Sequence, residues 1–574
     1  MSFPYAEIFW SEITENRNMF SSLIFLLSIL LSCHYVCVRY LYNQAYLSGN
    51  TGQRPPRYPY LIPYVGNLVS FVWDNAGFMT RATSYAGKLT SARVLFLGWE
   101  VYVFQDRETV KEIWNQKTLS SPFAIFQYVF KFFFGMSEAN LSVYRTDDSG
   151  PFRKPYANSK VAADDRVEYM TIASFHRALN GPGLAPTTRR FMRALVTRTA
   201  ELQLSEEWTE IPDLLDFFHH HVGASLVESI FGPTLLRLNP DFIDDMWEFD
   251  DNIPWLARAV PSWIMPKPYQ VREKIVSQFK RWYVYARQHF HESCISEDGD
   301  GDPFWGSYLT RYRQKSILQV KNHDDDMLAR TDMGLVWGAI GNTIPSAMMA
   351  MVEIIKDPDL LRRVRSNIQT NFGSAPLVDV DHKSLSRDPL LSSIYAETLR
   401  LYVKTYFMVS SPHTDVPLGK WVLPKGKIGL LNAGLSHMDT TFWNTKNGQH
   451  PVDSFWADRF LIYPSDPSSG PVNPSIREAQ HHKDQKARTN EHERTDPVFS
   501  MDGTEGSWFP YGGGYSICPG RFLAKSAILF TCAHLATEFD IELMIDSIET
   551  TSWRFGLGVA RPEHSIPFRI RKRK

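Results

Sequence analysis

One cysteine of this chain lies in a loop whose residues suit a metal-bound thiolate. The loop spans residues 508–521, reads WFPYGGGYSICPGR, and delivers Cys518 to the start of an apolar stretch that predicts a helix from about 521 to 537. Glycines allow positive φ and let the main chain lie flat against a macrocycle, where a Cβ would collide. Backbone N–H groups and the positive end of the helix stabilise a thiolate. The loop fits an axial ligand of haem iron; the alternative is a glycine-rich turn that happens to hold a buried cysteine.

A carboxylate and two arginines form a second candidate group. Glu397 and Arg400 are one helical turn apart, and the apolar residues around them predict that this face of the helix is buried. A buried ion pair needs further partners for the remaining guanidinium donors. The Asp-Arg-Phe sequence that contains Arg459 offers a third member.

The third candidate is a long apolar run from about 333 to 355, which predicts a helix with Pro345 in its interior. Such a proline removes a hydrogen bond, and the helix is expected to kink just before it. Asn342 and Thr343 stand at that point, where their amide and hydroxyl could take part in chemistry. The alternative is a buried helix in which these residues only ease packing.

In this order along the chain, the three motifs resemble the core of the cytochrome P450 family. The cysteine loop matches the family's haem signature at Tyr511, Gly512, Gly514, Cys518 and Gly520. The resemblance implies a mainly α fold with small β-sheets, and haem b (iron protoporphyrin IX) as the cofactor. It assigns the axial iron ligand to Cys518 and cofactor contacts to the three glycines.

The resemblance also assigns roles to the other motifs. Glu397, Arg400 and Arg459 would form the structural triad that holds the chain beneath the haem. Thr343 and Asn342 would lie at the groove of the central helix in which dioxygen is activated.

Two departures from the family pattern concern the cofactor. Tyr511 stands where Phe is usual, and Ser516 stands where an Arg or His normally meets a haem propionate. A propionate partner must therefore come from elsewhere. His413, after the Glu397 helix, has the better family position, and Arg177 is a weaker candidate.

A third departure, at Asn342, narrows the resemblance to one branch. The family usually has a carboxylic acid there, and an amide cannot relay a proton as a carboxylate does. Residues 342–345 (NTIP) and 516–521 (SICPGR) are similar to the branch of sterol 7-alpha-hydroxylases, sterol 12-alpha-hydroxylases and prostacyclin synthase. Its sterol hydroxylases tolerate Asn at this position, whereas prostacyclin synthase rearranges a peroxide without needing electrons.

The N-terminal region predicts a membrane anchor. The anchor is expected over residues 19–40. Within it, residues 19–38 form an apolar stretch of about the length that spans a bilayer, with acidic residues before it and arginines after it. The positive-inside rule then places the body in the cytosol. We expect a short lumenal segment (1–18), the anchor, a proline-rich hinge (41–66) and a catalytic domain (67–574). A buried core helix is the alternative for the apolar stretch.

Composition is consistent with this organisation. The 574 residues, 44% hydrophobic and 14% aromatic, can bury one large core. A net charge of −1 gives no electrostatic reason to expect nucleic acid as a partner. The five cysteines do not have zinc-like spacing and indicate neither a disulfide framework nor a structural metal site.

Four further segments carry predictions of their own. Residues 91–104 alternate around a glycine and predict a β-hairpin. The aromatic run 123–134 could form part of the substrate roof, dip into a membrane or pack in the core. The adjacent histidines 219–221 point to different helix faces and do not suggest a shared metal site. Residues 464–507 predict a disordered insertion.

Together these features imply a single-pass protein of the endoplasmic reticulum membrane whose catalytic domain faces the cytosol. Its expected activity is monooxygenation of a large apolar substrate (a steroid, terpenoid or similar polycyclic lipid) for a specialised, or secondary, metabolite. Electrons would come from NADPH through a separate NADPH-cytochrome P450 reductase, with cytochrome b5 as a second candidate donor, since the sequence has no flavin or nicotinamide motif. The alternatives are a reductase-independent isomerase of a lipid peroxide or epoxide, and a non-catalytic haem protein that binds a sterol-like ligand.

Overall fold

The computed structural model describes residues 4–47, 52–120, 123–373, 375–477 and 496–574. The chain forms two compact units. The first comprises Met1–Pro122 and Phe407–Asn432, and the second comprises Phe123–Tyr406 and Ala433–Lys574. The catalytic domain expected over 67–574 is therefore divided between both units.

The first unit begins with α1 (Pro4–Leu47), a helix of 44 residues. It extends beyond both ends of the expected 19–40 span, because no proline or glycine interrupts the sequence between Pro4 and Gly49. The described part of the expected lumenal segment and the start of the expected hinge are therefore helical. Phe20–Tyr46 is long and apolar enough to cross a membrane, and none of its most apolar window is buried.

The rest of the first unit is built on a small sheet with the strand order β3-β4-β9-β6. The predicted hairpin is confirmed: β3 (Ala92–Phe96) and β4 (Trp99–Val103) pair antiparallel. β9 (Ile428–Asn432) runs parallel to β4. The remaining elements are α2 (Leu68–Trp73), α3 (Asn75–Ala82), β1 (Ser84–Tyr85), β2 (Lys88–Leu89), α4 (Arg107–Asn115), β6 (Tyr406–Ser410), β7 (Val416–Leu418) and β8 (Trp421–Leu423).

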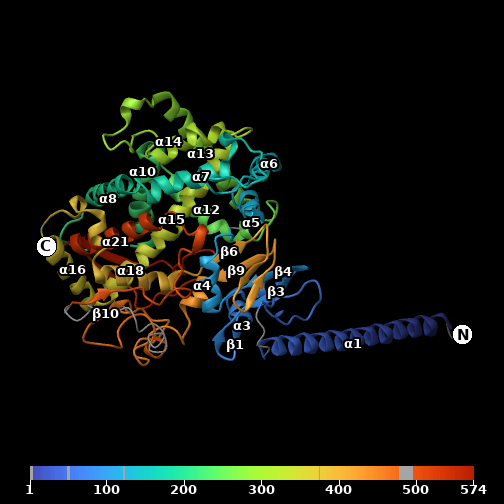
Figure 1. The fold of residues 1–574 in the computed structure, drawn as a ribbon. Coiled ribbons are helices and arrows are strands. Elements are labelled where there is room, and N and C mark those ends of the chain that lie inside the picture. Colours follow the sequence, from blue (N-terminus) through green and yellow to red (C-terminus); the bar gives the residue numbers. More distant parts are fainter. Residues whose placement is uncertain (1–3, 48–51, 121–122, 374, 478–495) are drawn as a thin grey trace. The chain divides into compact units, whose positions relative to one another are not determined.

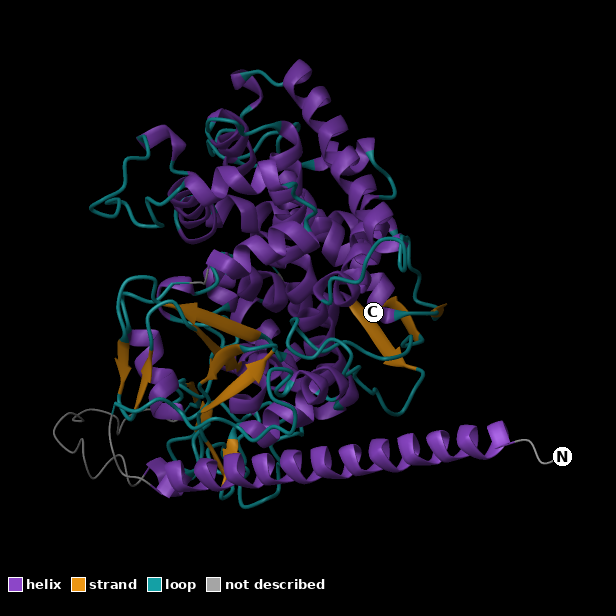
Figure 2. Ribbon diagram, turned by 90° about the vertical axis from the view of Figure 1, so that its right-hand side faces the viewer, coloured by secondary structure: helices purple, strands orange, loops and turns teal. Residues whose placement is uncertain are grey.

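The second unit is mainly helical, as predicted, with only short strands (Figure 2). Its α-helices are α5 (Phe123–Tyr128), α6 (Glu138–Thr146), α7 (Val167–Phe175), α8 (Leu184–Glu201), α9 (Leu214–Phe218), α10 (Ala224–Phe231), α11 (Pro233–Leu238), α12 (Phe242–Ala257), α13 (Lys267–His289), α14 (Tyr308–Lys315), α15 (Asp325–Lys356), α16 (Pro358–Phe372), α17 (His382–Leu385), α18 (Pro389–Tyr402), α19 (Ala433–His437) and α21 (Arg521–Glu538). Its strands are β5 (Thr209–Ile211), β10 (Leu461–Ile462), β11 (Val498–Phe499), β12 (Phe539–Leu543) and β13 (Phe568–Lys572). β12, β13 and β5 form one antiparallel sheet near the C-terminus.

The core of the second unit is organised around α15, which contacts α12, α18 and α21 (Figure 1). Its most apolar window is 72% buried, so it is a core helix of this unit. It starts earlier than predicted because the Asp324 side chain accepts a hydrogen bond of 2.8 Å from the N–H of Met327 and caps the first turn. The helix continues through Pro345 to Lys356.

The segment 464–507, expected to be a disordered insertion, has ordered residues at both ends. Val472 is buried and bridges to Trp443, and the Asn444 side-chain amide donates to the carbonyl oxygens of Ser468 and Gly470 at 2.7 and 2.8 Å. On the other side, β11 pairs with β10. The prediction is wrong at these ends because distant residues supply hydrogen-bond partners that local composition does not reveal. Residues 478–495 lie outside the described part of the chain.

Candidate active site

The loop that carries Cys518 is fastened to neighbouring segments by its aromatic residues. Trp508 donates its indole N–H to the carbonyl oxygen of Ala396 on α18 at 3.1 Å. The hydroxyl of Tyr395, also on α18, donates to the Tyr511 hydroxyl at 2.8 Å. These two bonds fix the start of the loop to the helix that carries Glu397.

The glycines shape the loop around the sulfur. Gly512 and Gly514 adopt φ of 70° and 58°, a region that strains other residues. The N–H of Cys518 donates to the carbonyl oxygen of Tyr511 at 3.0 Å, which closes the loop. A Cβ at Gly520 would lie 3.9 Å from the Cys518 Sγ, so this residue borders the sulfur closely.

The thiol of Cys518 lies at the start of α21. Burial raises the pKa of this thiol above its ordinary value, and the N–H groups of Gly520 and Arg521 together with the Arg521 charge offset that rise only in part. Those donors and the helix N-terminus favour the thiolate over the thiol once a cation is available to bind it. The sulfur is therefore placed as a metal ligand would need it.

Glu397, Arg400 and Arg459 form one fully buried ion cluster. Arg400 donates to both carboxylate oxygens of Glu397 at 2.7 and 2.8 Å, and Arg459 Nε donates to Glu397 Oε1 at 2.9 Å. Burial raises the pKa of Glu397, but the two guanidinium groups more than offset it, and the pKa lies below its ordinary value. A carboxylate between two arginines leaves one excess positive charge in the interior.

Backbone carbonyl groups satisfy the remaining guanidinium donors. Arg400 Nη1 donates to the carbonyl oxygen of His437 at 2.7 Å. Arg459 donates to the carbonyl oxygens of Asn444, Pro451 and Ser454. The cluster therefore joins α18 to the segment between α19 and β10. Its remaining guanidinium donors are hydrogen-bonded, which a buried ion cluster needs in order to be stable.

The central helix α15 has an accessible stripe in its mostly buried middle. Gly338 and Asn342 are exposed, and Leu335 and Ala339 are partly exposed. These positions share one helix face, so open space lies beside that face. Thr343, next in sequence, is 6% exposed. The Asn342 side chain points to the backbone of the C-terminal region, since a Cβ at Gly558 would lie 2.5 Å from Asn342 Oδ1.

Comparison with known proteins decides the family. Residues 235–461 match the family model described as Cytochrome P450. The chain is 31% identical to the cytochrome P450 monooxygenase fsoE of Humicola fuscoatra, over 91% of this chain and 88% of that protein. The chain belongs to the cytochrome P450 family. It is also 30% identical to the cytochrome P450 monooxygenase efuG of Hormonema carpetanum, over 91% of this chain and 90% of that protein.

The predicted kinship of this P450 with sterol hydroxylases is confirmed as well. It is 29% identical to the 5-beta-cholestane-3-alpha,7-alpha-diol 12-alpha-hydroxylase of Sus scrofa, over 46% of this chain and 49% of that protein. The chain is therefore a P450 monooxygenase, and its family implies haem iron as the cofactor.

The residues of this P450 fit that cofactor. A flat cofactor needs loop positions that carry no side chain, and Gly512, Gly514 and Gly520 provide such positions in the loop of Cys518. It also needs open space next to the central helix, and the stripe around Gly338 and Asn342 borders such space.

The two candidates for propionate contact belong to different units of the chain. His413 belongs to the first unit, after β6. Arg177 belongs to the second unit, where its guanidinium lies over the ring of Tyr308 at 4.1 Å. Both assignments remain predictions.

The aromatic run 123–134 is divided between core and surface. Phe133 and Phe134 are buried, with ring centroids 5.9 and 6.3 Å from Trp337 of α15, whereas Phe126 is exposed. Core packing, one of the three alternatives, accounts for the end of the run.

Sequence reasoning missed a buried carboxylate, Asp250 of α12, which binds Arg554, Arg561 and Trp337. The local signal is weak, because the Asp250-Asp251 pair shares its helix with a second pair, Asp244-Asp245. Neither arginine belongs to a recognisable motif, so the pairing could not be read from spacing.

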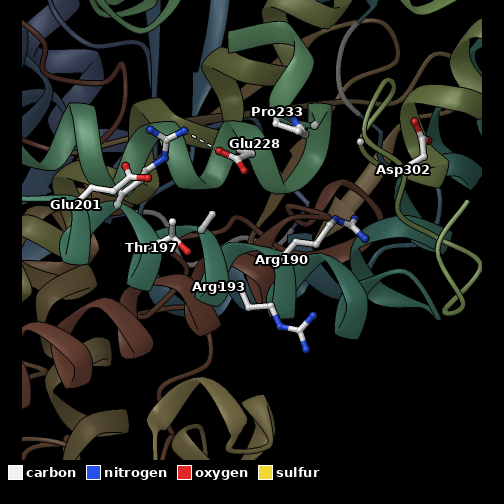
Figure 3. A pocket seen from close by; sticks show the side chains of 11 residues that line it. Arg190, Arg193, Thr197, Glu201, Glu228, Pro233 and Asp302 are labelled. Carbon is white, nitrogen blue, oxygen red and sulfur yellow. Dashed lines mark hydrogen bonds and ion pairs between the residues drawn. The ribbon is translucent and has the colours of Figure 1, made fainter. Parts of the chain in front are cut away.

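A hollow of about 360 Å³ lies elsewhere in the second unit (Figure 3). It is lined by three arginines, Arg190, Arg193 and Arg198, and three acids, Glu201, Glu228 and Asp302, together with smaller residues. Arg198 and Glu228 form an ion pair of 2.6 Å in this lining. Because the lining charges balance, we assign no ligand to this hollow.

Proposed function

We propose that this P450 inserts one atom of dioxygen into a large apolar substrate, such as a steroid, a terpenoid or a similar polycyclic lipid. The observation that carries the proposal is the pairing of an intact cysteine loop with an accessible stripe on α15 that has no ionisable side chain. Leu335, Gly338 and Ala339 offer an apolar wall, and Asn342 offers a single polar group.

Cys518 would bind the haem iron through its sulfur, and Gly512, Gly514 and Gly520 would form the cradle around the cofactor. Haem iron with a thiolate ligand supplies the activation of dioxygen, because the thiolate pushes electron density onto the metal. The buried triad of Glu397, Arg400 and Arg459 keeps α18 and the following segments in register with the loop. In this way it holds the sulfur in place.

Thr343 and Asn342 are the proposed proton-handling residues. The Thr343 hydroxyl can donate a proton toward dioxygen in the site, and an ordered water can return a proton to the hydroxyl. The Asn342 amide can orient that water through its N–H₂ and C=O groups, but it cannot carry the proton itself. The 12-alpha-hydroxylase relative supports a hydroxylase function for this branch.

The proposed electron source is NADPH through a separate NADPH-cytochrome P450 reductase, with cytochrome b5 as an additional donor. The specialised-metabolite role is supported by the two fungal monooxygenases, which cover about nine tenths of this chain, compared with 46% for the sterol 12-alpha-hydroxylase.

The proposed location is the endoplasmic reticulum membrane, with α1 as a single-pass anchor and the catalytic part in the cytosol. The first unit supports this by exposing many large apolar side chains outside α1: Leu61, Ile62, Tyr64, Val69, Val72, Trp73, Leu97 and Trp99. Gly66 bridges to both Ile62 and Phe96, which brings the hinge and the β3–β4 turn together. Exposed aromatic residues near an apolar helix are typical of a membrane interface.

Aromatic contacts support a fixed exit from this anchor. The rings of Tyr46 and Tyr85 stack with centroids 4.4 Å apart, and Tyr42 meets Tyr58 edge-on at 5.6 Å. The end of α1 is therefore packed against the first unit.

The test is turnover with isotopically labelled dioxygen. The full-length protein in membranes is supplied with reductase, NADPH and a panel of sterols, terpenoids and fatty acids, and binding is followed by the haem absorption spectrum. The proposal expects a product that contains one labelled oxygen atom and requires NADPH.

The isomerase alternative rests on Asn342, which replaces the usual acid. It predicts conversion of a lipid peroxide without NADPH and without incorporation of labelled dioxygen. That result would overturn the monooxygenase proposal for this chain's natural substrate.

A further inference from the structure

One buried carboxylate joins three segments of the second unit. Asp250, on α12, is 1% exposed. Arg554 Nη2 lies 2.9 and 3.0 Å from its two carboxylate oxygens, and Arg561 Nη2 forms a second ion pair with it. The indole N–H of Trp337, on α15, donates to the same carboxylate.

Both arginines belong to one segment, the C-terminal hairpin (residues 549–563). Its two arms pair through backbone hydrogen bonds of 2.9 Å, from Thr551 N–H to the Arg561 carbonyl oxygen and from Glu563 N–H to the Glu549 carbonyl oxygen. Arg554 lies on the first arm and Arg561 on the second. Asp250 therefore binds both arms of the hairpin at once.

The tip of this hairpin lies beside the proposed oxygen-activating residues. A Cβ at Gly558 would be 2.5 Å from Asn342 Oδ1, and the Gly558 carbonyl oxygen accepts from the N–H of Lys404 at 3.0 Å. The carboxylate itself lies against the preceding residue of α15, because a Cβ at Gly341 would be 3.4 Å from Asp250 Oδ1. We call the ion pairs of Asp250 with Arg554 and Arg561 the clamp. The clamp and the tip thus contact Gly341 and Asn342, two consecutive residues of the central helix.

We propose that Asp250 is a positioning residue that holds the hairpin tip against Asn342 and so fixes one wall of the substrate site. The inference rests on the proposed function only in treating the space beside Asn342 as that site. A neighbouring acid, Asp251, also contacts Arg561 at 3.0 Å, but its side chain is 70% exposed. Asp250 therefore carries the clamp.

Loss of the clamp has a specific consequence. Without the ion pair, Arg554 no longer ties the first arm to α12, while Trp337 and the central helix remain packed. The tip can then move relative to Asn342, and small errors of position in an active site carry large penalties. Bulky ligands, which reach the wall, are affected, whereas a ligand too small to touch it is not.

The experiment compares two buried ion pairs next to the same helix. Arg554→Met breaks the clamp. Arg313→Met breaks a matched pair, in which Arg313 Nε and Asp332 Oδ1 of α15 are 2.5 Å apart and both side chains are 2% exposed. The probes are imidazole and 1-phenylimidazole, a small and a bulky ligand of haem iron, whose binding is titrated spectroscopically on the full-length haem-loaded protein.

We expect Arg554→Met to raise the Kd of 1-phenylimidazole by about tenfold, equivalent to about 1.4 kcal/mol. The affinity for imidazole should be nearly unchanged. Arg313→Met lowers the unfolding temperature but leaves both affinities as in the wild type. Equal effects of the two substitutions on 1-phenylimidazole, or no effect of Arg554→Met, would overturn the proposal.

If Arg554→Met does not fold, Arg554→Lys supplies the test, because it keeps the charge but cannot bind both carboxylate oxygens in the same way. An intermediate change in 1-phenylimidazole affinity supports the clamp, and an unchanged affinity contradicts it. These readouts need no turnover, so failure of the monooxygenase proposal would be seen separately, as the absence of an NADPH-dependent product.

Discussion

The hydroxyl of Tyr395 on α18 donates a hydrogen bond of 2.8 Å to the hydroxyl of Tyr511 in the cysteine loop. Burial raises the pKa of Tyr395 well above its ordinary value, so the hydroxyl stays protonated at physiological pH. Lys525 of α21 lies over the Tyr395 ring, with Nζ 5.4 Å from the centroid. Tyr511, which stands where the family usually has Phe, therefore has a hydrogen-bond partner on α18, the helix that also carries Glu397.

We expect Tyr395→Phe and Tyr511→Phe each to lower the free energy of unfolding by about 1 kcal/mol, since each removes one partner of the same bond. The double variant should be about as stable as either single variant. Denaturant unfolding of the four proteins measures this. Costs that simply add would show that the two hydroxyls are not coupled.

Glu397→Gln should destabilise the protein by about 3–5 kcal/mol, because two buried guanidinium groups lose their counter-charge. The matched control is Asp359→Asn, which removes an exposed acid from its ion pair with Arg362 and should have almost no effect. Thermal unfolding compares the two. A small loss in Glu397→Gln would mean that the backbone carbonyls alone stabilise the arginines.

The same cluster sets a pH dependence. The pKa of Glu397 in the folded protein lies below its ordinary value of 4.5. Its stabilising contribution is therefore fully present above about pH 4.5 and is lost as the pH falls through the lowered folded-state pKa. Acid unfolding of Glu397→Gln should accordingly show a shallower pH dependence in that range than the wild type.

Thr343→Ala should release more hydrogen peroxide per NADPH consumed and lower the product yield by about tenfold or more, on the scale of general acid–base effects. Asn342→Asp should be tolerated, because it restores the acid that the family usually has. Peroxide and product are quantified against NADPH in the same reaction. Full coupling in Thr343→Ala would contradict the proton-handling role, even for an enzyme that still hydroxylates.

Deletion of residues 1–40 should move part of the protein from the membrane pellet to the soluble fraction. Part of the shortened protein should stay in the membrane pellet, because Trp73 and Trp99, 90% and 70% exposed, remain on the first unit. Adding Trp73→Ser and Trp99→Ser to the deletion should release more protein. Val284→Ser, at an exposed position on α13, is the control. Release by the control equal to that by the tryptophan substitutions would argue against the apolar surface of the first unit.

The sequence was most informative where chemistry restricts residue type over a short span. Three features can each be recognised from local sequence: the cysteine loop, the Glu397–Arg400 helix turn and the central helix. Their order along the chain resembles that of one family. The mainly helical fold followed from that resemblance. The 91–104 hairpin followed from alternation around a glycine.

What the sequence could not reveal are partners that lie far apart along the chain. Asp250 meets Arg554 and Arg561 only because the C-terminal hairpin returns to α12. The ends of the 464–507 segment are ordered because Asn444 and β10 provide their hydrogen bonds. Polar composition predicts solvation, and it contains no information about such distant partners.

The central claim is that Cys518 binds haem iron, and the most direct test is the spectrum of the reduced protein with carbon monoxide. The wild type should absorb near the position typical of thiolate-ligated haem. Cys532→Ala, which alters a buried cysteine of α21, the helix that follows Cys518, should retain that band. Cys518→Ala should lose it. Persistence of the band in Cys518→Ala would contradict the assignment of the ligand.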